Sequence, residues 1–317
     1  MIQTAVVYIV FNRPEHTKKS FAVLREQKPS KLFIVADGPR KTNPKDIELC
    51  KKVKDIVQKV EWPCEVHYNF ANSNMGLKKR VSSGINWAFD HVERAIVLED
   101  DCIAHPDFFY FCDSLLEYYS ENNNISVITG NNFQKNQWRG DASYYFSKYN
   151  HCWGWATWKR AWKHYQGTIP FWPEWRNSDI WQKQTPDKVE QNFWKVIFER
   201  VYKGQIDSWA YPWIASIWYH KGLTVTPNMN LVSNIGFDEG STHTSKKNSE
   251  FSKMPTTKLG VLKHPKKIQR NIEADLWTFN YHFGGKNLRF PNNLILFPYR
   301  LLGYVVRSIA KIYKKIL

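Results

Sequence analysis

The first hundred residues alternate short strand-forming runs with amphipathic segments, and this alternation limits the fold more than any other feature of the chain. The strand-forming runs predict strands at residues 5–11, 31–36, 65–70 and 94–98. Apolar residues at helical spacing between them predict helices at residues 15–27, 44–60 and 80–91. Because parallel strands need long crossover connections, this series predicts an α/β fold with a doubly wound sheet.

The fourth predicted strand delivers three consecutive carboxylates, Glu99, Asp100 and Asp101, at its carboxyl end. Ligands of open α/β sheets bind outside that edge. Crowded carboxylates repel one another unless a cation neutralises them, and hard oxygen ligands suit Mg²⁺ or Mn²⁺. Strand alternation sends Asp100 to the face opposite its two neighbours, so not all three bind a metal directly. The alternative is an acidic turn in which Asp101 or Asp107 caps the next helix.

The composition limits the class of partner and the compartment. Lysine and arginine number 45 against 29 acidic residues, and this net charge of +16 favours nucleic acid, an anionic membrane surface or a phosphorylated ligand. Five cysteines without CxxC spacing predict reduced thiols in a cytosolic protein. The apolar N-terminal run lacks a basic leader and predicts a strand rather than a signal peptide. No stretch is apolar over the length of a membrane span, which predicts a soluble or peripheral protein.

The last predicted element is a basic amphipathic helix at residues 294–317. Cations fall on one side of it, at Arg300, Arg307, Lys311, Lys314 and Lys315. Apolar residues cover the other side, which is the pattern of a helix lying in a membrane interface. We therefore expect a peripheral protein on the cytoplasmic, inner face of the cell membrane. The alternative is a terminal helix docked on the protein's own core.

Several segments of the sequence resemble known glycosyltransferases. Residues 95–111 (AIVLEDDCIAHPDFFYF) are similar to the acidic-motif region of N-acetylglucosaminyltransferase I and related enzymes of the GT-A type. Residues 10–13 (VFNR) resemble the first strand and nucleotide loop of the same family. Residues 151–158 (HCWGWATW) and 230–244 (NLVSNIGFDEGSTHT) resemble a bacterial branch of such transferases, often found among surface-polysaccharide genes. The resemblance implies a Rossmann-like mixed sheet with helices on both faces.

The resemblance also implies roles for the acidic residues. It makes Asp101 the metal ligand and places Asp100 near the ribose or sugar of the donor and Glu99 near the sugar hydroxyls. It makes His243, in a loop over the donor, a second metal ligand, and an imidazole ligand favours Mn²⁺ over Mg²⁺. The alternative for His243 is an ordinary polar loop residue.

Further donor contacts are implied at the other strand ends. The resemblance places Asn12 and Arg13 against the uracil or ribose of a UDP-sugar. It makes Asp37 a partner of the base or ribose, although Asp37-Gly38-Pro39 is also a strong turn signal.

A second loop lies at the same predicted sheet edge. Gly76 allows close backbone approach there, and Lys78 or Arg80 could pair with phosphate.

An inverting transferase needs a base that deprotonates the acceptor hydroxyl, and Asp207 is the candidate. The runners-up are Asp238 and Glu239, and the alternative for Asp207 is a helix N-cap before Trp209. Twelve of the 15 tryptophans lie between residues 138 and 218. Four of them are candidates for stacking on acceptor sugars, with core packing as the alternative for each: Trp153, Trp155, Trp158 and Trp209.

Together these features predict a metal-dependent hexosyl- or N-acetylhexosaminyltransferase. We expect it to move a sugar from a UDP-sugar to a saccharide or lipid-linked saccharide, with inversion, in cell-surface polysaccharide or lipopolysaccharide synthesis. The expected division is a nucleotide-sugar-binding half at residues 1–120, an acceptor-binding half at 121–245, an irregular extension at 246–293 and the membrane-surface helix at 294–317. The alternatives are a metal-dependent nuclease or phosphoesterase, and an inactive glycan-binding domain. A nucleic-acid partner is not expected, since no binding motif is present and the cations concentrate in the terminal helix and loops.

Overall fold

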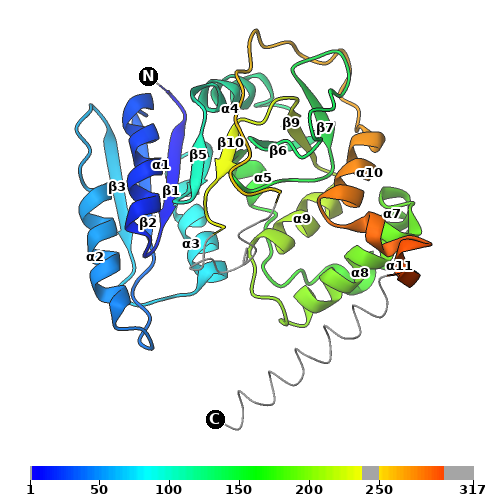
Figure 1. Ribbon diagram of the computed structural model, residues 1–317, viewed down its shortest axis with the longest axis horizontal. Helices are drawn as coiled ribbons and strands as arrows, with labels where there is room; N and C mark the ends of the chain where they lie inside the picture. The colour runs from blue at the N-terminus through cyan, green and yellow to red at the C-terminus, as the bar shows by residue number, and fades with distance from the viewer. Residues whose placement is uncertain (1, 238–249, 296–317) are drawn as a thin grey trace.

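The computed structural model describes residues 2–237 and 250–295, and Figure 1 shows their arrangement. Residues 296–317, most of the predicted membrane-surface helix, and His243 lie outside the described residues. The strands are β1 (Ala5–Val10), β2 (Lys31–Ala36), β3 (Glu65–Phe70), β4 (Arg94–Glu99), β5 (Cys102–Ala104), β6 (Ile125–Thr129), β7 (Tyr144–Ser147), β8 (Trp155–Trp158), β9 (Leu223–Pro227) and β10 (Val232–Asn234).

The helices fall into two groups along the chain. The first group is α1 (Pro14–Gln27), α2 (Lys45–Val57), α3 (Leu77–Phe89) and α4 (Pro106–Tyr118). The second is α5 (Lys159–Trp162), α6 (Trp172–Trp175), α7 (Asp179–Gln184), α8 (Lys188–Tyr202), α9 (Ala210–Tyr219), α10 (Ile272–Tyr281), the 3-10 helix η1 (Gly285–Leu288) and α11 (Asn292–Ile295).

Eight of the strands form one mixed sheet in the order β3-β2-β1-β4-β8-β6-β9-β7. The first four are parallel, as the strand-helix alternation predicted, and β8 enters antiparallel between β4 and β6. A separate two-stranded sheet pairs β5 with β10 in antiparallel register. The predicted α/β fold class, with a Rossmann-like mixed sheet and helices on both faces, is confirmed, and the GT-A type stays a prediction.

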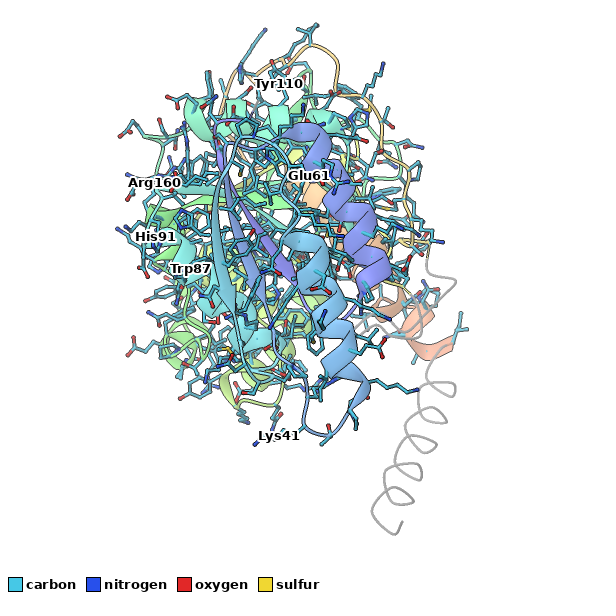
Figure 2. All side chains as sticks on the ribbon, turned by 90° about the vertical axis from the view of Figure 1, so that its left-hand side faces the viewer. Lys41, Glu61, Trp87, His91, Tyr110 and Arg160 are labelled. Carbon is cyan, nitrogen blue, oxygen red and sulfur yellow. The ribbon has the colours of Figure 1, made fainter. Side chains whose placement is uncertain are left out.

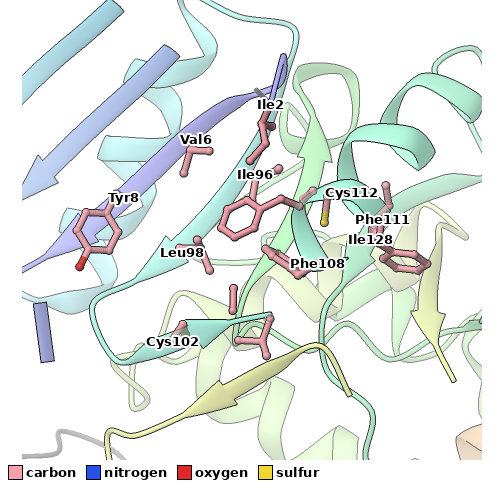
Figure 3. Packing of buried hydrophobic residues seen from close by; sticks show 14 of the residues in the cluster. Ile2, Val6, Tyr8, Ile96, Leu98, Cys102, Phe108, Phe111, Cys112 and Ile128 are labelled. Carbon is pink, nitrogen blue, oxygen red and sulfur yellow. The ribbon is translucent and has the colours of Figure 1, made fainter. Parts of the chain in front are cut away.

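Strand alternation divides the buried side chains into two cores, one on each face of the sheet. In β1, Val6, Tyr8 and Val10 enter one core, and the residues between them enter the other. Helices α1, α2 and α4 cover the first face, where Figure 3 shows Phe108 of α4 packed near Leu98 of β4. Figure 2 shows α1 and α2 side by side over that face. Burial on both faces explains why β1, β2 and β4 are apolar runs, whereas the edge strand β3 has no buried residue.

The second face carries the tryptophan-rich part of the chain. Helices α3, α8 and α9 pack there, with a cluster of buried indole rings from Trp155, Trp162, Trp172, Trp175, Trp181, Trp194, Trp209, Trp213 and Trp218. Three of the four candidate sugar-stacking residues are buried in core positions, namely Trp155, Trp158 and Trp209. For these three the sugar-stacking interpretation is wrong and the core alternative holds, because a buried ring has no face open to a ligand.

The segment expected to be an irregular extension, residues 246–293, is partly helical. Helix α10, η1 and the start of α11 lie within it, and Asn271 caps α10 by accepting a hydrogen bond from the Ala274 amide at 2.8 Å. No clear hydrophobic period is detectable in this segment, because α10 carries apolar residues on both its buried and its exposed sides. None of the helices within residues 2–237 and 250–295 combines the length and the apolar character needed to cross a membrane.

Candidate functional site

Strands β1, β2 and β4 end at one edge of the sheet, and the polar residues that follow them meet there. The register pairs Ile9 with Glu99, and the Asp37 amide donates to the carbonyl of Val10 at 3.1 Å. Three loops, which follow β1, β2 and β4, therefore line the carboxyl edge of the parallel strands. This is where ligands of open α/β sheets bind.

Asp101 is fixed at this edge by contacts from two parts of the chain, Arg13 and residues 234–236. Its Oδ2 lies 3.2 Å from the Arg13 guanidinium, and its Oδ1 accepts a hydrogen bond from Asn234 Nδ2 at 3.1 Å. The Ile235 amide donates to its carbonyl at 2.9 Å. A Cβ on Gly236 would lie 2.1 Å from Asp101 Oδ2, so only glycine allows this approach. The β5–β10 ribbon thus holds the Asp101 carboxylate, which remains partly exposed.

Asp100 points to different partners. Its side chain is buried, its Oδ2 lies 3.4 Å from the Phe11 amide, and its carbonyl accepts from Ser20 Oγ at 2.8 Å. It joins β4 to the end of β1 and to α1. The two aspartates diverge, in line with the alternation argument, and Asp100 is the more structural of the two.

The alternative of an acidic turn capping the next helix is wrong. The N-cap of α4 is His105, whose Nδ1 accepts a hydrogen bond from the Asp107 amide at 3.1 Å. Asp107 instead accepts from the Leu259 amide at 2.7 Å. Neither Asp101 nor Asp107 serves as the cap, which leaves Asp101 available at the sheet edge.

The edge carries a concentrated negative potential. Burial and the charges of Asp101 and Asp100 together raise the pKa of Glu99 to about 8, and Arg13 opposes this shift. A cation beside these carboxylates would lower their mutual repulsion. Within the described ranges, no group of three or more His, Cys, Asp or Glu side chains is arranged to hold a metal ion. A site with one carboxylate ligand still fits Mg²⁺ or Mn²⁺ when phosphate oxygens of a substrate supply other ligands.

Asp37 organises the neighbouring loop. Its buried carboxylate accepts hydrogen bonds from the Gly38 amide at 2.8 Å, the Met75 amide at 2.9 Å and Asn74 Nδ2 at 2.9 Å. The turn interpretation of Asp37 is therefore correct, and this turn anchors the loop that precedes α3. A contact of Asp37 with a nucleotide stays a prediction.

Asn12 is positioned by a residue that the sequence did not single out, Asp46. This buried carboxylate accepts from Asn12 Nδ2 at 2.8 Å and pairs with Arg40 Nε at 2.6 Å. Hydrogen bonds from Arg40 lower the pKa of Asp46 to about 2. The only sequence signal was an acid in the first turn of a predicted helix, which is common and has an ordinary explanation in the helix dipole.

The loop before α3 ends at Gly76, which adopts φ +81° as the N-cap of the helix. Lys78, in the first turn, is half-buried. Its side chain passes close to Gly167, since a Cβ added to that glycine would lie 3.3 Å from Lys78 Cε. Arg80 is buried, and its guanidinium donates to the Asn69 side chain at 3.0 Å. The phosphate-binding alternative at Arg80 is therefore wrong, since this side chain ties α3 to β3, and Lys78 is left as the candidate.

The candidate base Asp207 is exposed in the loop between α8 and α9. It is not an N-cap, because α9 is capped by Trp209 without a side-chain bond and the Ala210 amide bonds Ser208 Oγ at 3.2 Å. Its catalytic role stays a prediction. The runners-up Asp238 and Glu239, like His243, lie outside the described residues.

Trp153 is the sugar-stacking candidate that is not fully buried. Its ring meets Phe237 edge-on at 5.5 Å and Phe133 at 5.3 Å between centroids. Phe237 directly follows Gly236, which contacts Asp101. Burial and the charges of Glu99 and Asp101 raise the pKa of the adjacent Cys152 to about 12, which places this segment beside the acids. An aromatic wall of Trp153 and Phe237 thus stands next to Asp101.

The solved structures that resemble the chain include distant likenesses among nucleotide-sugar and related enzymes. No protein-family model matches the chain, and no curated protein matches it. A mannosyltransferase from Pyrobaculum calidifontis, solved in complex with GDP-Man and Mn²⁺, is 9% identical with a TM-score of 0.35, over 68% of this chain and 73% of that one. A 4-diphosphocytidyl-2C-methyl-D-erythritol synthase from Anaerococcus prevotii is 8% identical with a TM-score of 0.34, over 71% and 88%.

A UDP-glucose pyrophosphorylase complexed with UDP-glucose is 15% identical with a TM-score of 0.25. That match spans 46% of this chain and 62% of the pyrophosphorylase, less than two thirds of its length. Likenesses at these identities and TM-scores assign no activity to the chain. The functional conclusion below therefore depends on the residues at the sheet edge.

Proposed function

We propose that this protein is a glycosyltransferase that uses a nucleotide-sugar donor and a divalent metal ion at Asp101. The observation that carries the proposal is the acidic edge itself. Asp101 is held by Arg13 and Asn234 at the carboxyl end of the parallel strands, beside Glu99, whose pKa is raised by burial and by its acidic neighbours. A nucleoside diphosphate is itself negatively charged, so it binds beside these carboxylates only together with a cation.

The metal would be Mn²⁺ or Mg²⁺, held by Asp101 and by phosphate oxygens of the donor. When bound, it would act as a Lewis acid that stabilises the diphosphate leaving group. The Arg13 guanidinium, 3.2 Å from Asp101 Oδ2, already balances part of the negative charge of this carboxylate. His243 is proposed as the second protein ligand, by resemblance to the transferase family.

The donor would be a UDP-sugar lying along the ends of β1 and β2. Asn12, Arg13 and Asp37 are the proposed contacts to the base and ribose, with Glu99 and Asp100 nearer the sugar. The amides at the start of α3, beyond Gly76, and the Lys78 ammonium would face the diphosphate. The first turn of α3 contains no acidic residue, which suits an anion.

The acceptor would be a saccharide, free or lipid-linked, that stacks on the partly exposed ring of Trp153, which the buried Phe237 supports edge-on. Asp207 is the proposed base for an inverting transfer of a hexosyl or N-acetylhexosaminyl unit. By the family resemblance, the product would belong to cell-surface polysaccharide or lipopolysaccharide. The protein would work at the inner face of the cell membrane, attached there by residues 294–317.

The test is release of nucleoside diphosphate from individual UDP-sugars by the full chain with Mn²⁺. We expect at least one UDP-sugar to yield UDP, faster with a saccharide acceptor and not in the presence of EDTA. A parallel incubation with RNA and single-stranded DNA, without any sugar donor, examines the nuclease alternative. Cleavage of either nucleic acid together with no release from any nucleotide sugar would contradict the proposal.

A further inference from the structure

Apolar side chains gather on the surface of the last described part of the chain. Of the 15 large hydrophobic residues that are exposed among the described residues, seven lie between residues 261 and 295. Six of these form what we call the C-terminal apolar surface: Ile268, Ile272, Leu276, Phe290, Leu294 and Ile295. Scattered single hydrophobic residues on a surface are ordinary, but such a concentration marks an interaction site.

Helix α10 supplies the first half of this surface. Ile272 and Leu276 are four residues apart and lie on one side of the helix, with exposed fractions of 66% and 39%. Ile268, 40% exposed, lies in the segment that leads into α10. The opposite side of α10 packs into the protein through Ala274 and Thr278. The helix is therefore already fixed by its inner side, and its outward stripe is not needed for that packing.

Helix α11 and Phe290, which lies between η1 and α11, supply the second half. Phe290, Leu294 and Ile295 are 79%, 64% and 62% exposed. The 3-10 helix η1 contacts both α10 and α11, so the two halves belong to one packed unit. Figure 1 shows α10 and α11 together at one end of the molecule, away from β3 and α2.

The charges around this surface are positive. Lys266 and Lys267 directly precede Ile268, and Lys286 lies in η1; all three are exposed, and none pairs with a carboxylate of the described residues. The two acids of α10 are neutralised. Glu273 pairs with Arg139 at 2.6 Å, and the buried Asp275 pairs with Arg270.

We propose that the C-terminal apolar surface docks on an anionic lipid membrane. Apolar side chains that stand beside unpaired lysines are the pattern of a protein face that enters the headgroup layer. The positive charge favours anionic lipid over a second copy of this chain, which would bring the same lysines into contact with each other. The inference uses no residue of 296–317 and does not depend on the glycosyltransferase proposal, although it would bring the site close to a lipid-linked acceptor.

The experiment is co-sedimentation of the full chain with vesicles of phosphatidylcholine, alone or in equal parts with phosphatidylglycerol. We expect binding to the anionic vesicles only, weakened at high salt. The double variants Ile272→Ser/Leu276→Ser and Phe290→Ser/Leu294→Ser should each lower the partition coefficient at least about tenfold, since two apolar side chains leave the interface. Lys266→Gln/Lys267→Gln should lower binding and its salt dependence.

The matched control is Ile47→Ser/Tyr68→Ser, which removes exposed hydrophobic residues from α2 and β3 at the other end of the molecule. It should bind vesicles like the unchanged protein. The proposal would be overturned if both apolar double variants bound anionic vesicles as tightly as the unchanged protein. It would also be overturned if the control variant lost as much vesicle binding as they do. Two further results would overturn the proposal when the surface variants still bind vesicles normally. Dissociation of a dimer would show that a second copy covers this face, and a lower stability would show that the protein's own chain covers it. Titration with UDP and Mn²⁺ on the same variants keeps this outcome separate from the transferase proposal.

Discussion

Replacing Asp101 by asparagine should lower kcat/KM for sugar transfer about a thousand-fold and abolish metal-dependent donor binding. The substitution keeps the size and the hydrogen bond from Asn234 Nδ2, which reaches Oδ1 at 3.1 Å. It removes the one charge that we assign to the metal. Loss of a metal's stabilisation of the leaving group costs several kcal/mol, and each factor of ten in rate corresponds to about 1.4 kcal/mol. Steady-state kinetics with a UDP-sugar and Mn²⁺ measures the effect.

The matched control is Asp55→Asn on α2, which removes a carboxylate that pairs with Lys51 at 2.8 Å on the surface. Its kcat/KM should equal that of the unchanged protein. Urea denaturation of both variants separates a catalytic effect from unfolding. A fully folded Asp101→Asn protein with undiminished Mn²⁺-dependent transfer would remove Asp101 from the metal site.

Replacing Lys148 by methionine should destabilise the protein by about 3–5 kcal/mol, because it leaves a buried carboxylate without its cation. The Lys148 ammonium lies 2.9 Å from Glu190 Oε1, and both side chains are almost wholly buried. Their orientation makes this a charge pair rather than an aligned hydrogen bond. The ammonium also lies 4.5 Å from the ring centre of Trp218, and Tyr149 donates its hydroxyl to Glu190.

Urea denaturation measures this loss in the free energy of unfolding. The double variant Lys148→Met/Glu190→Gln should recover much of it, since no unpaired charge remains buried. Lys159→Met is the matched control: its partner Glu93 is 82% exposed, and such a surface pair contributes about 0–1 kcal/mol. Equal destabilisation by the two single variants would show that the buried pair has no special role.

Most of the parallel half of the fold could be predicted from the sequence because β1, β2 and β4 are buried on both faces and are therefore continuous apolar runs. The predicted bounds of β2 agree with the structure, and so do those of the edge strand β3, which is polar and has no buried residue. The β5–β10 ribbon could not be predicted, since it pairs Cys102 with Asn234 across more than a hundred residues. Strands of three residues leave no period to detect.

Long-range contacts also explain what was missed at the site. The sequence placed Asn12 and Asp101 at strand ends, but their partners Asp46 and Asn234 come from a helix and from the distant ribbon. For the tryptophans, local pattern does not distinguish a ring in the core from a ring in a cleft. The structure makes this distinction: Trp155 lies in a strand between two packed layers and is buried, while Trp153 precedes that strand and lies beside Glu99 and Asp101.

The most direct test of the central claim is calorimetric titration of the purified full chain with UDP, first with Mn²⁺ and then with EDTA. The account predicts saturable binding of UDP in Mn²⁺, its loss on chelation, and no such binding by Asp101→Asn. Metal-independent binding, or no binding of UDP or any other nucleoside diphosphate, would contradict a metal-assisted nucleotide-sugar site at Asp101.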